Sequence, residues 1–316
     1  MGDQDIYLAK GYKVDKLIDR PMIFFHVPKA AGTTVGNILS ILFNSNIRIS
    51  GLVTRPSEKL QNNYEYRLDV SKKKYSHTHS ALDQFYEKKS QIDLTSKKLI
   101  FGHFPYEITN DIADIDSRIK MTILRDPIQR CQSHINYFIS KGIIKSPIDI
   151  PNILKDRIVE SNLLTRQFSG KSNVNYVEDE HVKSAIKNIK KLDFIFEINQ
   201  IQHLLNTIIS IYDFPNILYQ RINVTSDLNP NIQKYQFTDE DNEIIKKYNQ
   251  YDIDFYSRIG EEKLFFKAPI DNKVRDKNQT LLISTYLSPV LEIIDNKRLS
   301  YYLNKIKETN KTFVTT

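Results

Sequence analysis

A short, mostly apolar run is followed at once by a loop whose residues could bind phosphate. Residues 22–27 contain two phenylalanines, and the loop that follows brings Lys29 and Gly32 together with two threonines. A loop between a buried strand and a helix aims backbone N–H groups and the positive end of the helix dipole at one point, which suits an anion. We therefore expect a phosphate-binding loop made of Lys29, Ala30, Ala31, Gly32, Thr33 and Thr34.

This loop departs from the pattern of enzymes that hydrolyse nucleoside triphosphates. Their loops close with Gly-Lys and then a Ser or Thr whose hydroxyl binds Mg²⁺, whereas Lys29 stands three residues before Gly32. A lysine at the start of the loop lies beside the strand end, where it can neutralise charge at a leaving group without a metal. The spacing favours a metal-free transfer over nucleotide hydrolysis.

Several segments resemble a known family in the order in which they follow one another. The segment His26–Thr34 is similar to the 5′-phosphosulfate loop of the sulfotransferases that include the heparan sulfate 2-O-sulfotransferases and many bacterial relatives. Leu124–Arg130, with Ser133 and His134 after it, resembles the 3′-phosphate site of that family. The resemblance covers about residues 20–260 and includes three further segments: Phe101–Tyr106, Ser161–Gly170 and Asn223–Thr225.

The resemblance implies a donor and an acceptor. The donor would be 3′-phosphoadenosine-5′-phosphosulfate (PAPS), with 3′-phosphoadenosine-5′-phosphate (PAP) as the product, and the acceptor a glycan hydroxyl. Arg125 would grip the 3′-phosphate with its fork of N–H donors, and Ser133 would add a hydroxyl. The sulfuryl group carries less charge than a phosphoryl group, so we expect no metal.

The resemblance also implies the catalytic residues. His103 is the candidate general base, because an imidazole titrates near neutral pH and the motif places it at a strand end. Lys29 is the candidate for stabilising or protonating the leaving oxygen. The competing interpretation is that His103 only packs, and we interpret His26 as a support for the loop. Arg166 is a candidate acceptor contact, or else a residue that locks a helix through a salt bridge.

The elements around these residues predict an α/β fold of three layers, P-loop-like, with a mostly parallel central sheet flanked by helices. Apolar spacing predicts a helix over 34–43 with Thr33 as its N-cap. Asp126 and Pro127 are typical of the start of another helix, which we expect to run to about Ser140. Further strands are expected over 98–104, 119–124, 192–198 and 217–222, and one more helix over 239–259.

We divide the chain into two parts. Residues 20–260 form the predicted sulfotransferase domain, with a polar insertion over about 44–96 that includes a helix near 80–89. Residues 261–316 form a predicted C-terminal helical extension, with a helical pattern after Thr280. We find no motif in this extension.

Composition restricts the class of protein and of partner. The 316 residues are 40% hydrophobic and 26% charged, as in ordinary globular proteins, and the net charge of +7 favours anionic partners. Cys131 is the only cysteine, so no internal disulfide or thiolate metal site can form, and His77 with His79 are too few ligands for a metal. The sequence has no apolar run of about eighteen residues, so we do not expect stable insertion into a membrane. We expect a cytoplasmic protein, or one of the Golgi lumen if an anchor has been removed.

Two other functions compete with sulfuryl transfer. A P-loop nucleotide kinase or hydrolase would share the fold class but needs Mg²⁺ ligands and a lysine nearer the helix. A non-catalytic basic protein could bind glycans or nucleic acid, yet the basic residues, such as Lys72–Lys74, do not gather into a recognised nucleic-acid module. We expect no nucleic-acid partner.

Overall fold

The structure is a computed structural model that describes a little more than half of the chain. All statements below concern the ranges 5–8, 20–43, 46–50, 86, 94–140, 142–144, 148–156, 158–172, 174, 176–214, 216–220, 234–265, 279–283, 293–294 and 313–315. Several predictions fall outside them: His77, His79, Lys72–Lys74, Asn223–Thr225 and, apart from Tyr86, the helix near 80–89.

A five-stranded parallel sheet lies at the centre of the molecule. Its spatial order is β3-β4-β2-β5-β6, and every neighbouring pair is parallel. The middle strand, β2, is buried along its whole length, as expected for a strand that is covered on both faces. The predicted parallel α/β fold is therefore confirmed. The five strands are β2 (Met22–His26), β3 (Asn46–Ser50), β4 (Leu99–His103), β5 (Ile119–Leu124) and β6 (Phe194–Glu197).

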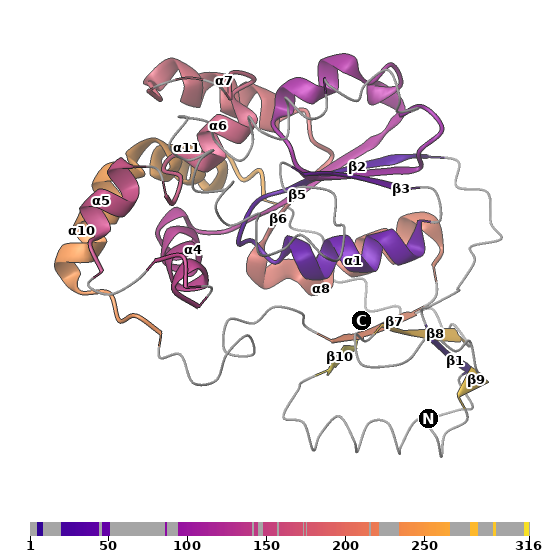
Figure 1. Ribbon diagram of the computed structural model, residues 1–316. Coiled ribbons are helices and arrows are strands. Elements are labelled where there is room, and N and C mark those ends of the chain that lie inside the picture. Colours follow the sequence, from indigo (N-terminus) through magenta and orange to yellow (C-terminus); the bar gives the residue numbers. More distant parts are fainter. Residues whose placement is uncertain are drawn as a thin grey trace.

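Helices cover both faces of this sheet and one end of it. Figure 1 shows α1 and α8 on one face, α6 and α7 on the other, and α4 beyond the carboxyl ends of the strands. The helices are α1 (Gly32–Leu42), α4 (Pro127–Ser140), α5 (Ile150–Lys155), α6 (Leu163–Phe168), α7 (Asp179–Ile189), α8 (Ile201–Tyr212), α10 (Asp239–Tyr248) and α11 (Gln250–Glu261). Short 3₁₀ turns are η2 (Tyr106–Asp111), η3 (Ile115–Ser117) and η4 (Ile198–Gln200).

The strand order favours a ligand site at the end of β2. The chain leaves β2 toward β3 and β4 on one side, and then continues to β5 and β6 on the other. Loops that leave neighbouring strands in opposite directions open a gap at the carboxyl edge of a parallel sheet, and ligands bind there in α/β proteins. The ends of β2, β4 and β5 carry the predicted loop, His103 and Arg125.

One predicted strand and one predicted helix differ in the structure. The expected strand over 217–222 is β7 (Asn216–Gln220), and it joins a second sheet of order β10-β7-β8-β1-β9 instead of the central one. Its parallel partner β8 (Gln279–Ile283) comes from the tail, where we expected a helix after Thr280. For residues 280–283 that expectation was wrong, because a short apolar run fits either element and pairing with β7 and β1 decides in favour of a strand. The remaining strands are β1 (Asp5–Leu8), β9 (Ile293–Ile294) and β10 (Phe313–Thr315).

Two further boundaries also differ from the sequence prediction. The stretch expected to be an insertion contains β3, an edge strand of the central sheet. The single helix expected over 239–259 is broken at Asn249 into α10 and α11. Asn249 is fully buried and its side-chain amide donates to the Ile245 carbonyl, so the residue ends one helix while its side chain serves a buried network.

Candidate active site

The loop that follows β2 has an unusual backbone. Lys29 has a φ of 68° and Ala31 a φ of 57°, both in the left-handed region that residues with a side chain seldom adopt. The Ala30 N–H donates to the Val27 carbonyl at 3.2 Å, which closes a tight turn between these two residues. Such conformations persist only where the surroundings hold them, and they gather at ligand-binding sites.

The helix that follows begins two residues earlier than predicted. Its N-cap is Ala31 instead of Thr33, and no side chain makes a capping hydrogen bond there. The left-handed Ala31 lets the chain enter the helix at Gly32, so Thr33 already lies inside the first turn. A helix that starts without a side-chain cap leaves backbone N–H donors of its first turn for another acceptor, and its dipole favours an anion.

Gly32 does not have a positive φ, so backbone strain does not call for a glycine here. Close packing does. A Cβ atom at this position would lie 1.6 Å from Cδ2 of His26, because the imidazole covers the glycine directly. His26 is 3% exposed, and its ring centroid lies 4.0 Å from that of His103. The ring of His26 is thus packed between the start of α1 and the end of β4.

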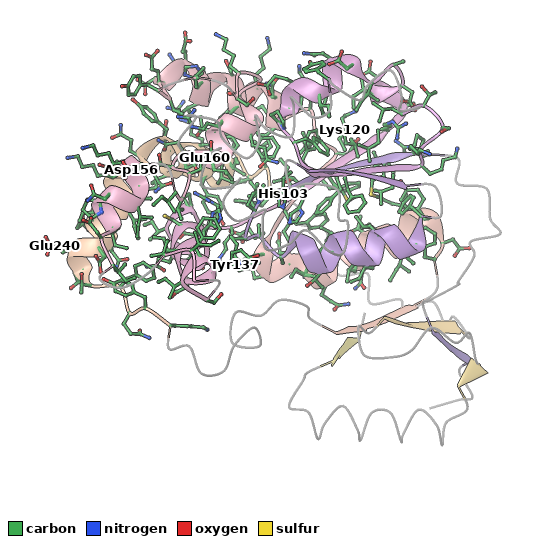
Figure 2. The ribbon with its side chains drawn as sticks, in the orientation of Figure 1. His103, Lys120, Tyr137, Asp156, Glu160 and Glu240 are labelled. Carbon is green, nitrogen blue, oxygen red and sulfur yellow. The ribbon has the colours of Figure 1, made fainter. Side chains whose placement is uncertain are left out.

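His103 is oriented by the main chain of the neighbouring strand. Its Nδ1 lies 3.0 Å from the carbonyl oxygen of His26. A carbonyl oxygen can only accept, so Nδ1 carries the proton and, in the neutral ring, Nε2 is the nitrogen that can take one up. Figure 2 shows His103 at the edge of the sheet that faces α4. This tautomer is the one that a base acting through Nε2 requires.

Arg125 lies against the loop from the end of β5. Its Nη1 donates to the Lys29 carbonyl at 3.3 Å, and its Nε is buried without a hydrogen-bond partner among the described residues. Burial lowers the pKa of this guanidinium; Asp126 opposes the shift and Arg130 adds to it. Ser133 lies two turns into α4 and is partly exposed, and no described hydrogen bond joins it to Arg125.

The side chain of Lys29 rests on an aromatic ring that the sequence analysis missed. Its Nζ lies 4.2 Å from the ring centroid of Tyr137 on α4, in cation–π contact. Tyr137 is four residues after Ser133, so the two share one face of α4. That spacing is the sequence signal that could have pointed to Tyr137.

Of two neighbouring polar residues in α6, the second lies at the site. Arg166 is buried, and its Nε lies 3.7 Å from a Glu160 carboxylate oxygen while its Nη1 donates to the Val174 carbonyl. Gln167 is fully buried, and its Nε2 lies 3.2 Å from the Phe104 carbonyl oxygen and 3.4 Å from that of His26. The sequence analysis named Arg166 and passed over Gln167.

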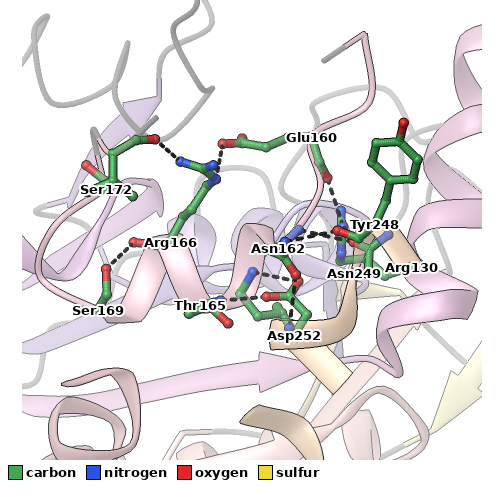
Figure 3. A network of polar contacts seen from close by, with 12 residues as sticks. Arg130, Glu160, Asn162, Thr165, Arg166, Ser169, Ser172, Tyr248, Asn249 and Asp252 are labelled. Atoms are coloured by element: carbon green, nitrogen blue, oxygen red, sulfur yellow. Dashed lines mark hydrogen bonds and ion pairs between the residues drawn. The ribbon is translucent and has the colours of Figure 1, made fainter. Parts of the chain in front are cut away.

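A buried polar network fixes the helix that carries Gln167. The Asp252 carboxylate accepts hydrogen bonds from the backbone N–H groups of Leu164 and Thr165, at 3.0 and 2.7 Å, in the first turn of α6. Burial raises the pKa of Asp252, and the charge of Arg130 opposes that rise. Figure 3 shows this network together with Asn162, whose backbone N–H donates to the Asn249 side chain.

Arg130 belongs to this network. It is fully buried, and its Nη2 donates to the Glu160 carbonyl at 3.0 Å and to the Asn249 side-chain oxygen at 3.4 Å. These contacts join α4 to the segment before α6 and to the junction of α10 and α11.

One group in the described ranges has the composition of a metal site. Glu178, Glu180 and His181 have ligand atoms within 4.8 Å of one another at the start of α7. Nδ1 of His181 already accepts the Glu178 backbone N–H, as part of a capping box. We assign no metal to this group.

One family model matches the part of the chain that contains the loop and its neighbours. The family model described as "Sulfotransferase family" matches residues 17–141. The match supports a sulfotransferase family for this segment. It spans the loop, His103, Arg125 and α4, and it ends before α6 with Gln167. No curated protein matches the chain.

A helix that crosses a membrane needs about twenty residues that are mostly apolar. None of the helices in the described ranges is long and apolar enough to cross a bilayer.

The packing of His26 on Gly32 predicts that alanine variants at two glycines differ in stability. We expect Gly32→Ala to lower the free energy of unfolding by roughly 1–3 kcal/mol, because the new methyl group must displace the imidazole. Gly260→Ala is the matched control in α11, where nothing lies within 4 Å of an added Cβ, and we expect it to be neutral or stabilising by up to about 1 kcal/mol. Urea unfolding measures both variants, and native stability for Gly32→Ala would contradict the packing.

Proposed function

We propose that the chain is a PAPS-dependent sulfotransferase that transfers the sulfuryl group to a glycan hydroxyl. The observation that carries the proposal is the grouping of the uncapped start of α1, Arg125 and His103 at the carboxyl ends of three adjacent strands. The family match supports sulfuryl transfer in general. The catalytic unit would be residues 20–260.

The donor would bind across the ends of β2 and β5. The first-turn N–H groups of α1 and the loop Lys29–Thr34 suit the 5′-phosphosulfate, since the helix carries no side-chain cap. Arg125 suits the 3′-phosphate, because its buried Nε has a donor to offer and the guanidinium already touches the loop. Ser133 on the following helix would add its hydroxyl.

The transfer would be an in-line displacement at sulfur. The acceptor oxygen forms a new S–O bond as the bond between sulfur and the bridging oxygen of PAPS breaks, and that oxygen leaves on PAP with the bonding electron pair. The acceptor proton passes to Nε2 of His103, and Lys29 stabilises the charge that develops on the leaving oxygen. No metal is required for this balance.

The acceptor is the least constrained part of the proposal. A net charge of +7 suits an acidic glycan, and the family resemblance supports a sugar hydroxyl. Arg166 was the candidate acceptor contact. Because its guanidinium is buried against Glu160 and the Val174 carbonyl, we assign it the alternative role of holding the segment around α6.

Nucleotide binding separates this function from its two competitors. We expect calorimetry to give PAP an affinity at least about tenfold higher than 5′-AMP, since each charge-assisted contact is worth roughly 1.5–3 kcal/mol. Arg125→Ala should bring the two affinities together. ATP with Mg²⁺ as the tightest ligand would favour the kinase or hydrolase, and tight binding of an oligonucleotide alone would favour the non-catalytic binder.

A variant of Lys29 tests its role at the leaving oxygen. Lys29→Ala should abolish turnover and also weaken PAP binding by about tenfold, because the lysine acts at the 5′ end of the nucleotide. Lys191→Ala is the matched control, since the Lys191 ammonium also lies over a tyrosine ring but outside the loop. PAP affinity and turnover measured on both variants test the assignment, and unchanged PAP affinity in Lys29→Ala would contradict contact with the nucleotide.

A variant of His103 tests its role as the general base. His103→Ala should reduce turnover by about 10²–10⁴-fold, the usual loss for a missing general base, and leave PAP affinity within about twofold. His203→Ala on α8 serves as the control for loss of an imidazole. Melting temperature, PAP affinity and turnover are measured on one preparation. A stable and fully active His103→Ala enzyme would show that the base is another residue.

A further inference from the structure

Gln167 bridges the chain segments that follow β2 and β4, beside the predicted loop and His103. The β2–β4 pairing ends at Phe25 and Gly102, so the chain beyond these residues is no longer held by the sheet on that side. The Gln167 amide reaches both separated chains there, at the Phe104 and His26 carbonyl oxygens. One side chain thus replaces the next rung of the ladder.

The orientation of this amide is determined by its surroundings. Its nitrogen faces two carbonyl oxygens, which can only accept, so a flipped amide would bring oxygen against oxygen. Gln167 is fully buried, and its Oε1 has no hydrogen-bond partner among the described residues. A glutamine with one satisfied end is a costly choice for a core position, where an apolar residue of similar size would fit.

The His26 carbonyl receives two side chains. Nδ1 of His103 donates to it, and Nε2 of Gln167 approaches it from α6. This carbonyl determines which nitrogen of His103 carries the proton, so whatever fixes the carbonyl also fixes the tautomer. The carbonyl belongs to the last residue of β2, just before the left-handed Lys29 and Ala31 and the tight turn that joins Ala30 to Val27.

We propose that Gln167 is a positioning residue for the reaction: it holds the His26 carbonyl in place and so keeps His103 in the tautomer with the basic Nε2. The inference rests on the proposed function for its effect on turnover. Its structural half, the tautomer of His103, stands independently of any substrate. Asp252 in turn holds Gln167 in place, because its carboxylate fixes the first turn of α6.

Nitrogen NMR of the imidazoles tests the inference directly. In protein labelled with ¹⁵N-histidine, at a pH above about 8 where imidazoles are mostly neutral, the two tautomers give distinct signals. The His103 signal is identified by its loss in His103→Ala. We expect the Nδ1–H tautomer in the native protein and a mixture of tautomers in Gln167→Met, which conserves volume but lacks the amide.

Turnover is measured on the same variants. We expect Gln167→Met to lose about ten- to a hundredfold in turnover per folded molecule, with PAP affinity within about twofold of native, because a misplaced base costs rate and not donor binding. Gln202→Met on α8 is the matched control, since the Gln202 amide also donates to one neighbour and leaves its oxygen without a hydrogen bond. Gln167→Glu is the second variant if Gln167→Met does not fold.

The outcomes separate the inference from the proposed function. An Nε2–H tautomer of His103 in the native protein, or a tautomer unchanged in Gln167→Met, overturns the inference whatever the turnover. Failure of the native protein to bind PAP or to sulfate any acceptor overturns the proposed function and leaves the tautomer result standing.

Discussion

The end of β2 at His26 is the point on which the candidate site depends. Its carbonyl oxygen is shared by side chains from β4 and α6, and its imidazole fills the space above Gly32 at the start of α1. Four elements therefore meet at one residue. Because two side chains meet its carbonyl oxygen and its ring packs on the start of α1, the loop after β2 and the candidate base cannot move independently of each other.

A second buried group transmits this constraint to the rest of the domain. Asp252 is enclosed completely, which raises its pKa, and two backbone N–H groups of α6 together with Arg130 oppose that rise. Buried charges of this kind contribute little net stability but are costly to disrupt singly. The network contributes orientation: it fixes a helix of only six residues, too short to be stable by itself, with Gln167 facing the strand ends.

The sequence predicts well the parts of this site that depend on local pattern. The β2–loop–α1 unit, the strands that end at His103 and near Arg125, and the Pro127 helix start all follow from runs of neighbouring residues. Gln167 and Tyr137 act through contacts with residues far away in the chain; the spacing from Ser133 gives a weak signal for Tyr137, and no local pattern distinguishes Gln167 from a packing residue. The same reason explains why β7 was placed in the wrong sheet and why the break at Asn249 was missed, since both depend on distant partners.

The electrostatics of the loop explain why its lysine stands at the beginning and not at the end. A cation at the first turn of α1 would meet the positive end of the helix dipole, which is unfavourable. The left-handed Lys29 instead directs its ammonium over the Tyr137 ring on α4, while its carbonyl accepts from Arg125. Two cationic side chains thus lie beside the loop that enters α1, each held by the protein at some cost in repulsion and desolvation. An anion with negative charge at two separated positions would relieve that cost at both, whereas one with a single charged end would relieve it at only one.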